Sequence, residues 1–104
     1  FSCQFDMKVP EAKREDVHDL LAMLNDRMWL GHFNLDMHQN MPLFRYTVLT
    51  RGGRMPGIES LEDLVEIALT ECERFYPAFQ LVIWGGKRPG EAMASSMIDV
   101  AGCA

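Results

Sequence analysis

Histidine is the side chain that metal sites and acid–base catalysis use most often, and the chain has three: His18, His32 and His38. His18 falls on the acidic face of a predicted helix, which is typical of a solvated side chain. His32 and Asp36 share one face of a predicted strand, but strand rise places them roughly 13 Å apart, too far to bind one metal ion. His32 and His38 would need a tight turn and a third ligand that the sequence does not offer. The histidines therefore predict no metal site.

The three cysteines, Cys3, Cys72 and Cys103, are the next candidates for chemistry. They are an odd number, far apart and without a C-x-x-C pair, which favours free thiols in a reducing compartment and hence the cytoplasm. Cys3 and Cys72 lie on apolar faces, where a thiol is buried and inert by default. No serine lies in a G-x-S-x-G elbow and the carboxylates are dispersed, so we expect no catalytic residue, no cofactor and no enzyme.

A glycine-rich run with two cations, residues 85–90, superficially resembles a phosphate loop. It lacks the G-x-x-x-x-G-K-[S/T] spacing, and a helix end followed by a helix start accounts for its glycines and proline. Lys87 and Arg88 of this run could join Arg51 and Arg54 in a basic corner. Because the net charge is −5, nucleic acid is not expected as the main partner, and contact through this corner is an alternative hypothesis.

The composition predicts one ordinary domain spanning residues 1–104: 48% of the residues are hydrophobic and 24% are charged. No apolar run approaches the ~20 residues that cross a bilayer, so no membrane partner is expected. The chain starts with Phe1 rather than methionine, already inside a strand-like pattern. We therefore expect that the domain lacks an upstream segment that would cover this strand.

Hydrophobic periodicity predicts three strands and a helix in the first half of the chain. Alternation over residues 1–9 predicts a strand with one wet face. Pro10 then begins a helix with one buried stripe, which runs to Met28. Alternation returns over 31–37 and 44–49, separated by a polar turn at 38–40, which predicts an antiparallel hairpin. Pro42 must lie at the start or the edge of its strand, since it cannot donate to a ladder.

The second half predicts helices. Residues 51–59 form a loop, and Ser60 with Asp63 resembles a capping box. The helix that follows carries one apolar face over five turns. Its members are Leu61, Leu64, Val65, Ala68, Cys72, Phe75, Tyr76 and Phe79.

Pro77 predicts a kink or a fresh start in this helix. Residues 79–84 could be a buried strand or a buried helix, and periodicity does not decide between them. Gly85 and Gly86 would supply left-handed caps if that segment is helical, and Pro89 opens a last helix through Ile98. The order of elements predicts an α+β fold, with helices packed on an antiparallel sheet.

Three stretches, taken together, resemble the YbjN family, described as bacterial sensory transduction regulators. They are Leu24-Asn25 followed by W-L-G-H-F, F-Y-P-A-F before I-W-G-G, and Pro89 with Glu91-Ala92 leading to Gly102. The resemblance implies a fold similar to type III secretion chaperones, which are small α+β domains that dimerise and bind segments of client proteins. It also implies that family members carry an N-terminal helix and strands that this sequence lacks, and that residues 79–84 are helical. It carries over no catalytic residue.

We therefore expect a non-enzymatic, cytoplasmic protein-interaction module that forms a homodimer and binds a client protein. Aromatic side chains dominate such contacts, so the interface residues we expect are Tyr76, Phe79, Trp84 and Trp29. Alternative hypotheses are a regulator that contacts nucleic acid through the basic corner, and a sensor that binds a small molecule under the hairpin.

Overall fold

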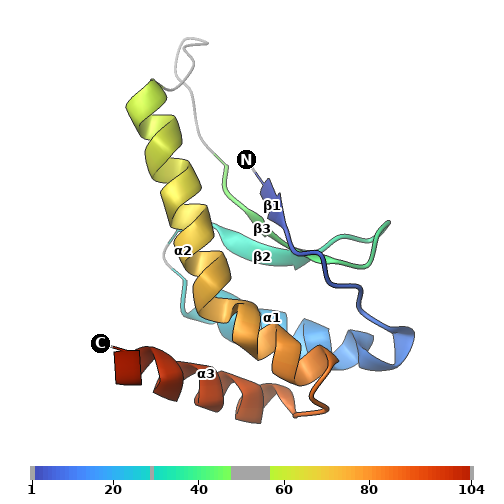
Figure 1. Cartoon of the computed structure of the whole chain (residues 1–104). Helices are drawn as coiled ribbons and strands as arrows, with labels where there is room; N and C mark the ends of the chain where they lie inside the picture. The colour runs from blue at the N-terminus through green and yellow to red at the C-terminus, as the bar shows by residue number, and fades with distance from the viewer. Residues whose placement is uncertain (1, 29, 48–56, 104) are drawn as a thin grey trace.

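The computed structural model describes residues 2–28, 30–47 and 57–103, which form a small sheet and a set of helices (Figure 1). The predicted α+β class with an antiparallel sheet is confirmed. In chain order the elements are β1 (Ser2–Gln4), the 3₁₀ turn η1 (Glu11–Lys13), α1 (Arg14–Asp26), β2 (His32–Leu35), β3 (Pro42–Arg45), α2 (Ile58–Ile83) and α3 (Pro89–Cys103).

The sheet has the order β1-β3-β2, and both pairs are antiparallel. The predicted hairpin is confirmed, because β2 pairs with β3 in the register Phe33 opposite Phe44. Its turn is held by the Asp36 carboxylate, which accepts from the His38 N–H at 3.0 Å, and by Asn40 in the left-handed region at φ 54°. Both strands are shorter than predicted, and residues 48 and 49 of the second one lie outside the described residues.

The first strand ends at Gln4, whereas the alternation predicted a strand over residues 1–9. The reason is Pro42. It is the first residue of β3, which confirms the prediction that a proline without an N–H lies at the start or the edge of its strand. The Phe5 N–H donates to the Pro42 carbonyl at 2.9 Å, but Pro42 has no N–H to return the bond, so the ladder stops. Alternate burial nevertheless continues through Phe5 and Met7 to Val9, whose N–H donates to the Asn40 carbonyl at 2.8 Å.

The outer edge of β2 is occupied by a side chain of α1. The Asn25 amide donates to the Phe33 carbonyl at 3.0 Å, and its Oδ1 accepts from the Phe33 N–H at 2.8 Å. One side chain thus satisfies both backbone groups of the strand residue as a neighbouring strand would, which closes this edge to further pairing.

The core is an aromatic cluster centred on Phe33. Its ring centroid lies 5.5–5.8 Å from those of Phe5, Phe44, Phe75 and Phe79, so one residue ties the sheet to the C-terminal half of α2. From α1, the predicted stripe of Val17, Leu20, Leu21 and Leu24 completes this core. The helix α3 packs on α1 and α2, below them in Figure 1, and adds Ala92 and Met93.

The helix α2 is one continuous element of 26 residues, which corrects the predicted capping box and excludes a fresh start at Pro77, one of the two alternatives predicted there. It begins at Ile58 after Gly57, so Ser60 lies inside its first turn and no side chain caps it. Pro77 does not start a new helix, because the chain remains helical through Ile83.

At the other end of α2, residues 79–83 are helical, as the family resemblance implies. Gly86 has the left-handed φ of 68°, whereas Gly85 does not, and the Lys87 N–H donates to the Leu81 carbonyl at 2.9 Å. The helix α3 begins at Pro89, as predicted, but extends beyond Ile98 to Cys103.

We expect Gly31→Ala to lower the free energy of unfolding by about 2–4 kcal/mol. Gly31 has φ +72°, and a Cβ there would lie 2.5 Å from Cζ of the buried Phe44 ring. Urea denaturation followed by circular dichroism measures the change. Gly90→Ala is the matched control, because a Cβ at Gly90 meets nothing within 4 Å. Equal stability of the two variants would contradict the described packing at β2.

Candidate functional site

The most exposed apolar side chains of α2 form one line on its N-terminal half, the apolar row of Leu61, Val65 and Leu69. They are 42%, 43% and 52% exposed. The sequence placed Leu61 and Val65 on the same apolar helix face as Phe75, and the structure leaves their end of that face exposed. The physical reason is length, because α2 is about 39 Å long and the four-residue strands are only about 13 Å long.

The apolar row continues the buried face of the same helix. Further along α2, Cys72, Phe75 and Phe79 occupy that face and are covered by the sheet. In Figure 1 the N-terminal turns of α2 rise beyond the strands, and none of the other described helices packs on them there. The radius of gyration of 14.8 Å exceeds the value of about 13 Å for a compact chain of this length, consistent with a projecting helix.

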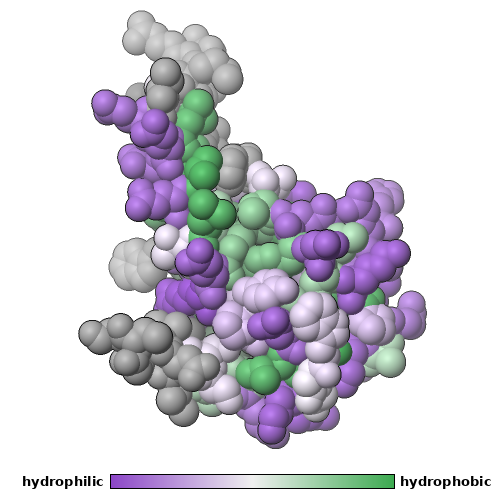
Figure 2. All heavy atoms as spheres, in the orientation of Figure 1, coloured by the Kyte–Doolittle hydropathy of each residue, from purple (hydrophilic) through white to green (hydrophobic). Residues whose placement is uncertain are grey.

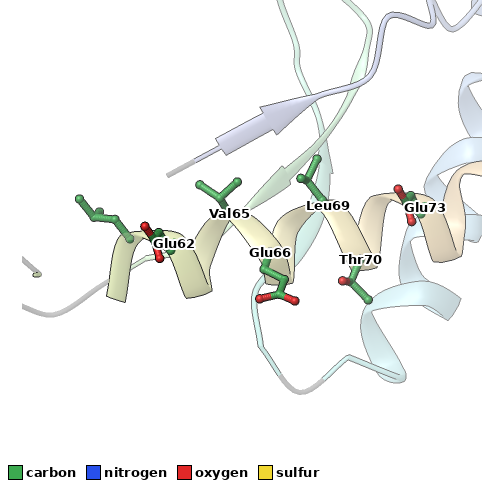
Figure 3. Close-up of a pocket in the computed structure, with 7 residues that line it drawn as sticks. Glu62, Val65, Glu66, Leu69, Thr70 and Glu73 are labelled. Atoms are coloured by element: carbon green, nitrogen blue, oxygen red, sulfur yellow. The ribbon is translucent and has the colours of Figure 1, made fainter. Parts of the chain in front are cut away.

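A shallow groove of about 480 Å³ runs along this part of α2. Figure 2 shows it as a hydrophobic column with a hydrophilic border, and Figure 3 shows Val65 and Leu69 on one side of the helix and Glu66 and Thr70 on the other. Its complete lining is Leu61, Glu62, Val65, Glu66, Leu69, Thr70 and Glu73.

Three carboxylates in this lining form an acidic row beside the apolar row: Glu62, Glu66 and Glu73. No basic side chain of the described residues forms an ion pair with any of them. Their negative charge is therefore available to a cationic partner.

A second hollow, of about 370 Å³, lies between α2 and the end of α1. Its wall mixes apolar side chains such as Ile67 with charged ones, among them Arg27 and Arg74. Arg74 is already engaged, since its guanidinium lies 3.8 Å from the Glu71 carboxylate and 4.9 Å from the centroid of the Phe75 ring. Both contacts lie within α2 and hold the guanidinium against its own helix.

The four predicted interface residues fall into different environments. Trp84 is 60% exposed at the C-terminal end of α2, and Tyr76 is half-buried with its ring 5.2 Å from that of Phe5. Phe79 is completely buried in the aromatic core and presents no surface to a partner. Trp29 lies outside the described residues.

The basic corner is described only in part. Lys87 and Arg88 are exposed in the turn between α2 and α3, whereas Arg51 and Arg54 lie outside the described residues. The interpretation of residues 85–90 as a helix end followed by a helix start is confirmed.

Of the described candidates for chemistry, the Cys3 and Cys72 thiols lie next to each other. The described part of the chain holds no group of three or more His, Cys, Asp or Glu side chains placed to bind a metal ion. Desolvation raises the pKa of the buried Cys72 thiol to about 12, and the neighbouring Cys3 thiol and Glu71 carboxylate act in the same direction. Cys72 is therefore poorly suited to nucleophilic chemistry at neutral pH.

The sequence predicted that a sheet edge or a helix face would need a partner, but it did not single out Leu69 or show which part of the apolar helix face is exposed. The available signal was the length of the apolar face, because five turns of helix are more than a short hairpin can cover.

Among the described residues, no helix is both long and apolar enough to cross a membrane.

The fold and this surface define a small α+β domain that presents an uncovered apolar helix face. A family model described as "Putative bacterial sensory transduction regulator" matches residues 1–81. The chain therefore belongs to the YbjN family. The match includes β1 to β3 and most of α2 with its groove, but ends before α3, so the resemblance around Pro89 and Gly102 lies outside it. No curated protein and no solved structure matches the chain.

We expect the Cys72 thiol of the native protein to react with iodoacetamide roughly a thousandfold more slowly at pH 8 than in denaturant. The raised pKa leaves far less thiolate in the folded state than in the unfolded one. Peptide mass spectrometry of timed samples measures the rate at this cysteine. Similar rates in the folded and unfolded protein would contradict the described burial.

Proposed function

We propose that this protein is a non-enzymatic regulatory domain that acts by binding another polypeptide. The observation that carries the proposal is the apolar row on α2, where Leu61, Val65 and Leu69 lie in line on the surface. Large exposed apolar patches with polar borders mark interaction sites in proteins of this size. Membership of a family described as sensory transduction regulators agrees with this role, since a regulator must transmit its state to a partner.

The proposal has three further parts. The fold is similar to that of type III secretion chaperones, with an α+β body that offers a helix face to clients. The protein works in the cytoplasm, which the free thiols of Cys3 and Cys72 support. It forms a homodimer through the exposed Trp84 at the C-terminal end of α2, because an aromatic side chain so exposed is a typical interface anchor.

The two alternative functions have weaker support. Nucleic-acid binding would rest on Lys87 and Arg88 against a net charge of −5. Binding of a small molecule was expected under the hairpin; the hollow beside Arg27 lies instead between α2 and the end of α1, and Arg74 in its wall already has intramolecular partners.

We expect the tagged protein, expressed in its own cells, to retain a defined partner that the triple variant Leu61→Ser, Val65→Ser, Leu69→Ser loses. The substitutions remove the apolar surface without touching the core, so folding should persist, as circular dichroism can verify. Quantitative mass spectrometry of the co-purified proteins measures the effect. Met37→Ser is the matched control, because Met37 is 69% exposed on the hairpin turn, away from α2. Recovery of the same proteins with all variants, or of none above background, would refute the proposal.

We expect sedimentation equilibrium to detect a dimer at micromolar concentration and Trp84→Ala to weaken it about tenfold or more. Loss of an anchor aromatic removes apolar area that only the dimer buries. Met37→Ser again serves as the control. A monomer throughout the concentration series would exclude the homodimer while leaving the binding of a different protein to its own test.

A further inference from the structure

We propose that the groove along the N-terminal half of α2 binds a basic amphipathic helix of a partner protein. The inference rests on the proposed function and names the chemistry of the partner. The ligand would present apolar side chains to the apolar row (Leu61, Val65 and Leu69) and Lys or Arg side chains to the acidic row (Glu62, Glu66 and Glu73).

The dimensions of the groove suit a helix of about three turns. Its lining runs from Leu61 to Glu73, a rise of about 18 Å along α2. The apolar row has a spacing of four residues, which is the spacing at which a second helix interdigitates. Apolar positions at i, i+3, i+4 and i+7 of the partner would cover the row.

An extended peptide fits this surface less well. Strand addition draws its affinity from unpaired backbone groups at a sheet edge. All residues that line the groove lie inside α2, where backbone groups bond within the helix. The surface therefore offers side chains only, and a helix presents its side chains to such a surface without leaving its own backbone groups unpaired.

The charges favour a basic partner over a second copy of this chain packed antiparallel. The three glutamates of the acidic row have no ion-pair partner among the described residues. In an antiparallel pair of α2 helices joined through their apolar rows, the two acidic rows would lie on the same side of the contact and repel one another. A helix with lysines on the matching flank turns this repulsion into attraction.

The test uses two synthetic helical peptides with identical leucine positions, one with lysine and one with glutamate on the flank that faces the acidic row. Circular dichroism confirms that both are helical before use. We expect fluorescence anisotropy at low salt to show binding of the lysine peptide, at least about tenfold tighter than that of the glutamate peptide. Its affinity should fall as salt is added.

Variants locate the site. Leu69→Ser should weaken the lysine peptide about tenfold by loss of apolar contact. The triple variant Glu62→Gln, Glu66→Gln, Glu73→Gln should reduce the preference between the two peptides to about twofold or less. The control is Glu59→Gln with Asp63→Gln, which removes two exposed carboxylates of the same helix that do not line the groove. This control should leave both affinities unchanged.

Four results would overturn the inference. Three concern the peptides: no binding of the lysine peptide, equal binding of both peptides, and binding that Leu69→Ser does not weaken. The fourth is a dimer that Leu69→Ser dissociates, because a second copy of the chain would then occupy the groove. If the cellular partner is lost in the triple serine variant while the lysine peptide fails to bind, the proposed function stands and only the chemistry of the partner is wrong.

Discussion

A long helix on a small sheet is the constraint on which the rest of this structure depends. The strands are three and four residues long, whereas α2 has 26 residues, so the sheet can cover only part of the apolar face of α2. The covered part is the aromatic core around Phe33. The uncovered part is the apolar row. Its contact with water is unfavourable, and burial against another molecule would remove that cost.

The shortness of the sheet has local causes. Pro42 ends the pairing of β1 by withholding an N–H, and Asn25 occupies the outer edge of β2 at Phe33. The sheet cannot extend on the β2 side at this residue, so additional apolar surface has to be covered by helices. The helix α3 covers part of α1 and α2, but the N-terminal turns of α2 lie beyond its reach (Figure 1).

The groove on α2, rather than a catalytic site, is the feature of this structure that fits a regulatory family. The Cys3 and Cys72 thiols lie next to each other, and burial favours the neutral form of Cys72. The exposed apolar row and three carboxylates without an ion-pair partner in the described part of the chain line one groove. This distribution of side chains is the observation on which the proposed role in binding rests, and the family match covers the part of α2 that carries it.

Local periodicity determined the class of each element. The strand alternation up to Val9, the buried stripe of α1, the hairpin with its turn at Asn40 and the start of α3 at Pro89 follow from the sequence alone, because they depend on neighbours a few residues away. The helical state of residues 79–83 came from the family resemblance, since an apolar run fits a strand or a helix equally well.

Tertiary structure decided what no local pattern contains. It placed Pro42 opposite Phe5, carried α2 through Pro77, and buried Phe79 while it left Leu61, Val65 and Leu69 exposed on a continuous apolar face. Periodicity shows which side chains share a face of a helix. How far that face is covered depends on the length and position of elements distant in the chain, and only their packing determines it.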